Sequence, residues 1–106
     1  MGFFDLFKRT DINEGVNQYK ATKNAVLLDV RSAGEYAGGH IPRSRNIDVN
    51  HIGGAERMIK DKQTPLFVYC HSGVRSGRAT SVLREMGYTN VNNIGGIAGY
   101  TGRVVR

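Results

Sequence analysis

The chain has 106 residues, which is enough for one domain with a single packed core. Its single cysteine excludes an intramolecular disulfide, and no stretch approaches the roughly 20 apolar residues that a membrane-spanning helix needs. The formal net charge of +6 favours anionic ligands, but the basic residues are dispersed and no nucleic-acid-binding motif accompanies them. We therefore expect a small anionic substrate, no nucleic-acid partner and no integral membrane association.

The first nine residues are predicted to be an apolar N-terminal extension, followed by a single domain at 10–106. The GFFDLF segment is too apolar for a free tail, so we expect it to pack on the domain or to self-associate. Position 6 is Leu6, where a myristoylation signal has serine or threonine, and no basic leader with a cleavage site precedes the domain. A free thiol suits a reducing compartment, so we expect a cytoplasmic protein.

Helix and strand patterns alternate along the chain. The predicted elements are a helix at 11–20, a strand at 25–30, a short helix at 32–39, a strand at 45–47, a helix in the second half of 50–61, a strand at 66–69, a helix at 76–86 and a strand at 91–94. The runs AVLLDV and LFVY are rich in branched or aromatic apolar residues, which is typical of strands buried on both faces. The pattern predicts an α/β domain with a small parallel β-sheet flanked by helices on both faces, and a ligand beyond the carboxyl ends of the strands.

The segment YCHSGVRS, residues 69–76, places the only cysteine at such a strand end. Because the chain turns at once into a helix, several backbone N–H groups of residues 71–76 lack helical partners and can converge on one point. The helix dipole and the charge of Arg75 add positive potential there, which favours the nucleophilic thiolate over the thiol. We therefore interpret Cys70 as a nucleophile in an anion-binding loop, although a lone cysteine after a strand is ordinarily an inert core residue.

The side chains around Cys70 have structural as well as functional interpretations. A cation at a helix N-terminus is unfavourable unless an anion is nearby, which favours an anion-binding role for Arg75 over that of a solvated surface residue. A thiolate stabilised by amides needs no general base, so we expect His71 to contribute its backbone N–H and to line the entrance with its imidazole. Ser72 and Ser76 fit turn and cap positions as well as substrate contacts.

Two further groups of polar residues can be interpreted from the sequence. Asp29 ends a buried apolar run, and because a buried charge must be paired, we expect a structural role for it beside Arg31 or a loop amide. The three histidines, His40, His51 and His71, show no metal-ligand spacing, so we predict no metal site.

Three stretches resemble rhodanese-like domains in sequence and in order: LLDVRSAGEYAGGHIPRSRNI at 27–47, VYCHSGVRS at 68–76 and NIGGIAGY at 93–100. Together they span nearly the whole chain. The resemblance implies a single rhodanese module whose loop cysteine accepts a sulfane sulfur as a persulfide and passes it on. It assigns the nucleophile to Cys70, the surrounding loop to His71, Ser72, Gly73, Val74, Arg75 and Ser76, and the supporting walls to Asp29, Arg31, Glu35 and His40.

This chain departs from the family pattern in two places. Many members read HIPGAxNI where this chain has Arg43, Ser44 and Arg45, and many carry tryptophan where it has Tyr100. Neither change touches the nucleophile, but both leave the substrate preference open. Arg43 and Arg45 are candidates for docking a partner, and they fit solvated edge charges equally well.

The resemblance implies an enzyme, a rhodanese-type sulfurtransferase that moves sulfur from a small anionic donor such as thiosulfate to cyanide or a thiol, with no metal or organic cofactor. The alternative is a persulfide carrier without turnover, which hands sulfur to a protein acceptor. A cysteine-dependent phosphatase is a weaker hypothesis. Protein tyrosine phosphatases have five residues between the cysteine and the arginine, whereas HSGV supplies four, and a shorter loop suits a smaller guest.

Overall fold

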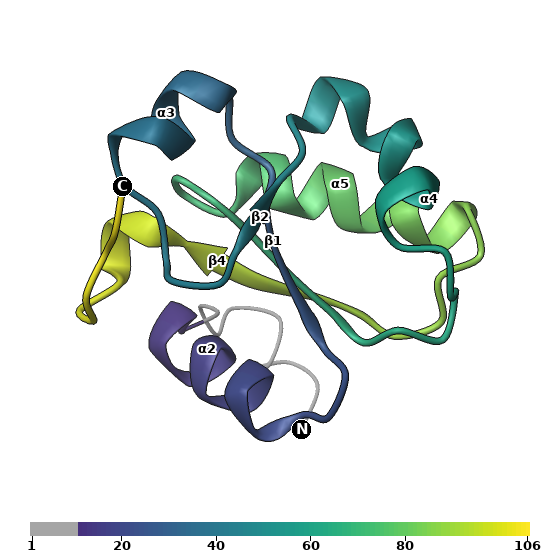
Figure 1. Cartoon of the computed structure of the whole chain (residues 1–106), viewed down its shortest axis with the longest axis horizontal. Coiled ribbons are helices and arrows are strands. Elements are labelled where there is room, and N and C mark those ends of the chain that lie inside the picture. The colour runs from purple at the N-terminus through teal and green to yellow at the C-terminus, as the bar shows by residue number, and fades with distance from the viewer. Residues whose placement is uncertain (1–10) are drawn as a thin grey trace, which may run out of the picture.

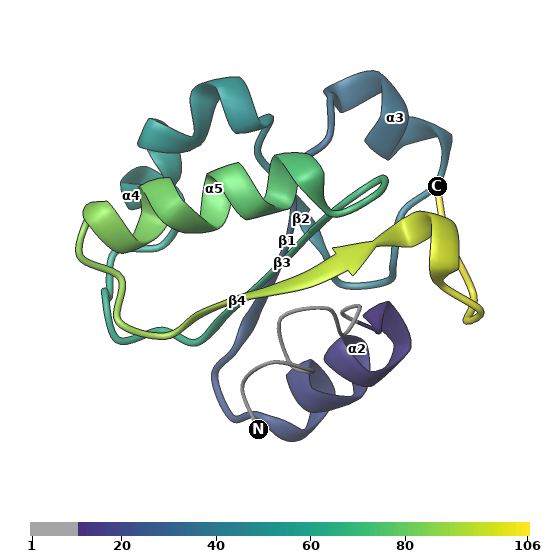
Figure 2. The ribbon, with the colours of Figure 1, turned by 180° about the vertical axis from the view of Figure 1, so that it is seen from behind.

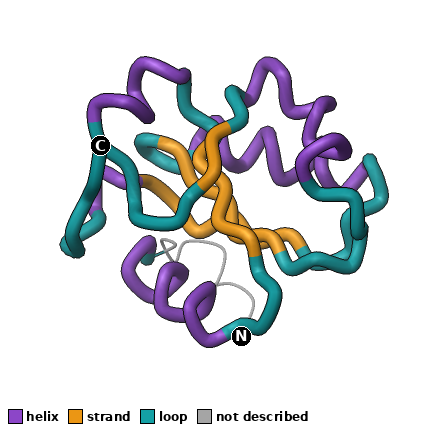
Figure 3. The backbone as a smooth tube through the Cα atoms, in the orientation of Figure 1, coloured by secondary structure: helices purple, strands orange, loops and turns teal. Residues whose placement is uncertain are grey.

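The computed structural model describes residues 11–106, so the predicted apolar extension at 1–9 lies outside the described residues. Four parallel strands form one sheet in the order β2-β1-β3-β4. Their bounds are Val26–Asp29 for β1, Arg45–Asn46 for β2, Leu66–Cys70 for β3 and Val91–Gly96 for β4. Figure 3 shows these strands as the centre of the molecule, with helical segments on either side. The predicted small parallel sheet is confirmed.

Helices cover both faces of this sheet, as the alternating pattern predicts (Figures 1 and 2). The bounds are Ile12–Ala21 for α2, Ala33–Gly38 for α3, Val49–Gly54 for the 3-10 helix η1, Ala55–Met58 for α4, Val74–Glu85 for α5 and Ile97–Gly99 for the 3-10 helix η2. Helix α2 lies on one face, whereas α5, α4 and η1 lie on the other. No helix within residues 11–106 combines the length and the apolarity needed to cross a membrane.

Strand β3 shows why the sheet needs cover on both faces, because all five of its residues are buried. Leu66, Val68 and Cys70 join the core cluster beneath α5, whereas Phe67 and Tyr69 join the cluster beneath α2. This alternation follows from the two-residue period of a strand. The side chain of Cys70 therefore lies on the α5 face of the sheet, at the carboxyl end of the inner strand β3.

Some element boundaries differ from the sequence-based expectations. Helix α5 begins at Val74, two residues before the predicted start, because Gly73 adopts a left-handed conformation with φ 105° and turns the chain directly into the helix. Arg75 and Ser76 consequently lie in its first turn. The helical segment expected in the second half of 50–61 begins earlier, at η1, where Val49 and Ile52 are buried in the α5-side core.

Candidate active site

The sulfur of Cys70 lies inside the turn between β3 and α5. The Gly73 backbone N–H donates to Sγ over 2.9 Å, and Ser76 Oγ lies 3.4 Å from Sγ. The left-handed φ of Gly73 allows its amide to point back toward the end of the strand, which an L side chain at this position would oppose. The turn from β3 into α5 thus brings a backbone N–H and a hydroxyl close to the same sulfur.

Two opposing effects set the pKa of the Cys70 thiol. Burial raises the pKa, because it penalises the charged form. Hydrogen bonds from the Ser76 hydroxyl and from the amides of Ser76, Gly73 and Ser72 lower it, and the net result is a pKa below the ordinary value of a cysteine. Cys70 is therefore more readily ionised than an ordinary cysteine, as a nucleophile requires.

The end of β4 and the 3-10 helix η2 that follows it contact the backbone of the cysteine loop. The Ala98 N–H donates to the His71 carbonyl over 3.1 Å, and a Cβ on Gly96 would overlap that carbonyl and the Cα of Ser72. Only glycine allows the two backbones to come this close. The second glycine of the 93–100 motif, Gly96, therefore has a physical role, which is to let β4 pack directly against the cysteine loop.

We expect Gly96→Ala to loosen the loop, because the colliding atoms belong to the backbone and cannot rotate away. The added Cβ should lower the free energy of unfolding by about 1–3 kcal/mol, the usual cost of overpacking. Gly34→Ala is the matched control, since a Cβ there meets nothing within 4 Å. Urea unfolding should show a loss only for Gly96→Ala, and equal stability of the two variants would contradict the proposed packing.

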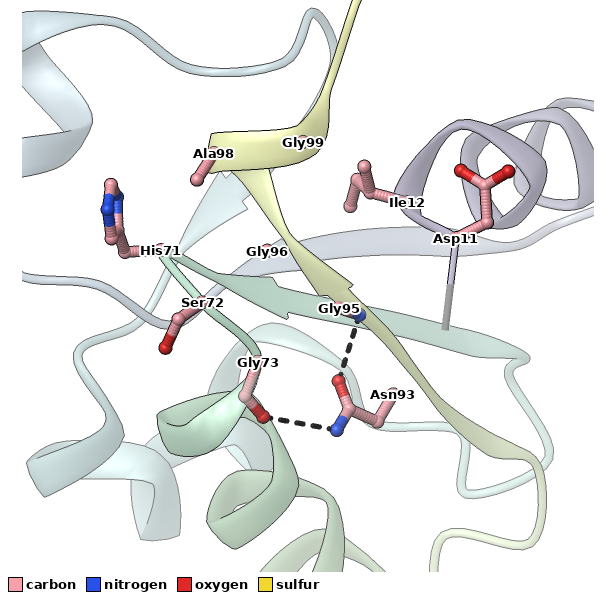
Figure 4. A pocket seen from close by; sticks show the side chains of 10 residues that line it. All are labelled: Asp11, Ile12, His71, Ser72, Gly73, Asn93, Gly95, Gly96, Ala98 and Gly99. Atoms are coloured by element: carbon pink, nitrogen blue, oxygen red, sulfur yellow. Dashed lines mark hydrogen bonds between the residues drawn. The ribbon is translucent and has the colours of Figure 1, made fainter. Parts of the chain in front are cut away.

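Asn93 holds the loop together from β4 (Figure 4). Its Oδ1 accepts from Ser76 Oγ over 2.7 Å and from the Gly95 N–H over 3.1 Å, while its Nδ2 donates to the Gly73 carbonyl over 3.2 Å. Asn93 is the first residue of the 93–100 motif, and no role was predicted for it. An asparagine inside a predicted strand, where its type is disfavoured, was the available signal.

The Ser76 hydroxyl has one proton and three possible acceptors, Asn93 Oδ1 at 2.7 Å, Cys70 Sγ at 3.4 Å and the Gly95 carbonyl at 3.5 Å. While Cys70 is a thiol, Ser76 can donate to Asn93 and accept from the S–H group. Once Cys70 is a thiolate, rotation of the hydroxyl gives its proton to the sulfur, and Asn93 Oδ1 keeps the Gly95 N–H. The hydroxyl can thus respond to the charge on Cys70 without any backbone movement.

Ser76→Ala should therefore raise the pKa of Cys70, because it removes the strongest of the hydrogen bonds that lower it. The rate of Cys70 alkylation, measured against pH, should shift toward higher pH. Loss of one hydrogen bond of about 1.5 kcal/mol corresponds to a roughly tenfold fall in the thiolate fraction of Cys70 at neutral pH, and the alkylation rate should fall with it. Ser72→Ala is the matched control, because the exposed Ser72 contributes only its backbone amide. A shift of equal size in both variants would contradict this role of the Ser76 hydroxyl.

Arg75 forms an ion pair across the top of the loop. Its two terminal nitrogens donate to the Glu35 carboxylate over 2.7 Å and 3.0 Å, and the two side chains are 36% and 37% exposed. This contact with Arg75, with help from the Ser32 backbone, lowers the pKa of Glu35 to about 2. The pair therefore ties α3 to the start of α5, and its contribution to stability is complete above the unfolded value of about 4.5 and is lost as the pH falls toward 2.

The other supporting residues lie around this contact without touching Cys70. Asp29 and Arg31 form the expected buried ion pair at 2.7 Å, and Arg31 also donates to the Gly39 carbonyl over 2.7 Å. His40 stacks on Tyr36 with ring centroids 3.7 Å apart, and its Nδ1–H donates to the Tyr36 carbonyl over 2.8 Å. These contacts hold in place the segment around α3, which carries Glu35.

A pocket of about 490 Å³ adjoins the outer side of the cysteine loop (Figure 4). His71, Ser72 and Gly73 form one wall, and the start of α2 and the end of β4 form the others. Cys70 does not line it and is 0% exposed. Contact with the sulfur from solvent therefore requires movement of the loop or of the Cys70 side chain. Within residues 11–106, no three His, Cys, Asp or Glu side chains gather as a metal site would require.

Comparisons with known proteins agree with this geometry. The sequence matches the family described as "Rhodanese-like domain" over residues 13–103. It is 37% identical over 83 residues to "Uncharacterized protein YqhL" of Bacillus subtilis. The aligned region covers 77% of this chain and 65% of that relative. It is 38% identical over 73 residues to "Thiosulfate sulfurtransferase PspE" of Escherichia coli, which covers 66% of this chain and 68% of the relative.

The solved structures include a close likeness as well. A structure described as "rhodanese with anions from E. coli" superposes with a TM-score of 0.72 at 32% identity and covers 77% of this chain and 98% of that chain. The chain itself spans about two thirds of the length of the two curated relatives, 65% and 68%. With a family match over 13–103, a parallel sheet of the same fold and the cysteine loop at its carboxyl edge, this chain belongs to the rhodanese-like domain family.

Proposed function

We propose that this chain is a sulfurtransferase in which Cys70 carries a sulfane sulfur as a persulfide. The observation that carries the proposal is the setting of the sulfur, which receives the Gly73 amide at 2.9 Å, lies 3.4 Å from the Ser76 hydroxyl and has a lowered pKa. Similarity to a protein named thiosulfate sulfurtransferase supports it. A reducing compartment such as the cytoplasm would keep the Cys70 thiol available.

In the first half of the proposed cycle, the Cys70 thiolate attacks the outer sulfur of a donor such as thiosulfate. A new S–S bond forms as the S–S bond of the donor breaks, and sulfite leaves with the bonding electron pair. The product is a Cys70 persulfide with one negative charge on its terminal sulfur. The amides of Ser72, Gly73 and Ser76, which lower the pKa of Cys70, are suited to stabilise this charge as well.

In the second half, an acceptor such as cyanide or a thiolate attacks the terminal sulfur. The persulfide S–S bond breaks, its electron pair returns to Cys70, and the acceptor leaves with the sulfur. An anionic acceptor needs no proton transfer in this step, so the proposed cycle assigns no general-base role to His71. The chemistry requires neither a metal nor an organic cofactor.

We assign Arg75 a more limited part in anion binding than its position alone favours. Both of its terminal nitrogens are bound to Glu35, so the carboxylate offsets much of its positive charge. We propose that the loop amides hold most of the charge of the persulfide, and that Arg75 mainly fixes the loop against α3. The pairing of Arg75 with Glu35 also argues against a phosphatase, whose arginine must be free to hold a phosphoryl group.

Intact mass tests the proposal directly. The reduced protein, incubated with thiosulfate and freed of excess donor, should gain the mass of one sulfur atom, and cyanide should remove it. Because the chain has one cysteine, peptide mapping should place the added sulfur on the peptide that contains Cys70. No gain in mass, or a gain that cyanide does not reverse, would contradict the persulfide cycle.

A second candidate function is the persulfide carrier, and one observation favours it. Cys70 is 0% exposed, whereas Val74, at the mouth of the same loop, is 77% exposed. A protein acceptor that packs on Val74 could open the loop and reach the sulfur, which a small thiol does less readily. Loading by thiosulfate together with slow release to cyanide and to small thiols would favour the carrier over the enzyme.

A further inference from the structure

A second cavity, which we call the basic pocket, lies on the α2 face of the sheet, opposite the face that holds the Cys70 side chain. It has a volume of about 500 Å³. Lys20, Arg43 and Arg103 line it, together with the rings of Tyr19 and Tyr100. None of its lining residues belongs to the cysteine loop, so the sulfur-transfer site leaves this pocket unexplained.

The charges of the basic pocket are all of one sign. No residue that lines it is acidic, and the ion pairs found within residues 11–106 are those of Arg31, Lys62 and Arg75. In this part of the chain, no carboxylate therefore pairs with the three cations of the basic pocket. Lys20, Arg43 and Arg103 are exposed and line one cavity, so each of them attracts an anion that enters it.

The backbone of Arg43 has an unusual conformation for a residue with a side chain. Two non-glycine residues in 11–106 have a positive φ, Asn24 at 64° and Arg43 at 72°. Asparagine tolerates this region, whereas arginine is strained in it. The related family motif HIPGAxNI has glycine here, which would adopt the same conformation freely. Arg43 thus lines the basic pocket from a strained backbone position.

Tyr100, which lines the basic pocket, packs closely against the following backbone. A Cβ on Gly102 would overlap the ring of Tyr100, so the backbone at 102 lies directly against that ring. The backbones of His40 and Val105 also pair, which ties the C-terminal segment to the segment that carries Arg43. Tyr100 therefore contributes an aromatic ring to the lining of the basic pocket.

We infer that the basic pocket binds a small molecule in which a phosphate group is attached to a flat ring, as in an aryl phosphate or a nucleotide. Guanidinium groups match the geometry of phosphate oxygens, and tyrosine rings stack on flat ligands. A volume of about 500 Å³ lies within the usual range of small-molecule sites. The inference is independent of sulfur transfer, because it shares no residue with the cysteine loop.

Titrations followed by amide NMR spectra test this inference on the full chain. Phenyl phosphate and ADP are the probes, adenosine supplies a ring without charge, and pyrophosphate supplies charge without a ring. We expect both probes to shift the amides of residues 19–20, 43 and 100–103 and to leave 71–76 unchanged. Adenosine and pyrophosphate should each bind at least about tenfold more weakly than ADP, since each loses one of the two kinds of contact.

Arg43→Gly separates binding from folding, because glycine removes the side chain and relieves the positive φ at once. The variant should bind ADP at least about tenfold more weakly than the wild type and should melt at no lower temperature. Arg45→Ala is the matched control: it removes the same charge from an exposed neighbour that does not line the basic pocket, and it should bind ADP like the wild type.

Three outcomes would overturn the inference. The first is that neither phenyl phosphate nor ADP shifts any resonance at about 5 mM, a concentration that would reveal even a millimolar site. The second is that the shifts fall on residues 71–76, which would assign the anion to the cysteine loop. The third is that Arg43→Gly and Arg45→Ala weaken ADP binding equally. That result would mean that the net charge of the protein, and not the basic pocket, determines the affinity.

Discussion

Cys70→Ser should abolish sulfur transfer and leave the fold intact. A serine hydroxyl is far less nucleophilic than a thiolate and cannot form a persulfide, so the rate of thiocyanate formation from thiosulfate and cyanide should fall by at least about 10³-fold. The serine Oγ can still accept the Gly73 N–H that now binds Sγ. We therefore expect a loss of stability of only about 1 kcal/mol, because this hydrogen bond is kept.

The comparison with Ser76→Ala makes this prediction specific. Ser76→Ala alters the pKa of Cys70 but keeps the nucleophile, so its activity should recover as the pH is raised, whereas Cys70→Ser should stay inactive at every pH. Amide NMR spectra of Cys70→Ser should retain the wild-type pattern outside the loop. Measurable turnover by a folded Cys70→Ser protein would contradict the mechanism.

The loop could be predicted from sequence because its signals are local. Cys70 follows an apolar run, and Gly73 and the helix that begins at Val74 come directly after it. These neighbours in sequence determine that backbone amides surround the sulfur. The same holds for the parallel sheet, since two uninterrupted apolar runs separated by helical patterns indicate buried parallel strands.

The contacts that complete the site join residues far apart in the chain, and no short pattern reveals them. Glu35 binds Arg75 across 40 positions, and Asn93 holds Gly73 across 20. The basic pocket is likewise assembled from three separate segments, so Arg43 was predicted only as a candidate docking residue. The burial of Cys70 under its own loop also depends on packing that the sequence does not express.

The ion pair of Asp29 and Arg31 should be the most important polar contact for stability. Asp29 is 0% exposed, and its carboxylate accepts from the Arg31 guanidinium over 2.7 Å and from the Arg31 backbone N–H over 2.9 Å. Asp29→Asn would leave the buried guanidinium without its counter-charge. Breaking a buried pair in this way costs about 3–5 kcal/mol, because the remaining charge is neither solvated nor paired.

Glu56→Gln provides the matched control for Asp29→Asn. The pair of Glu56 and Lys62 has the same 2.7 Å length, but its side chains are 54% and 33% exposed, and water replaces the lost contact. Both substitutions convert a carboxylate to an amide of nearly equal size. Urea unfolding at neutral pH should show a loss of about 3–5 kcal/mol for Asp29→Asn and of at most about 1 kcal/mol for Glu56→Gln. Losses of similar size would mean that burial does not determine the strength of these pairs. A large loss of unfolding free energy for Asp29→Asn alone would identify the buried pair as the contact that anchors the carboxyl end of β1. The chain continues from this strand end into α3, which carries Glu35, and Glu35 binds Arg75 of the cysteine loop.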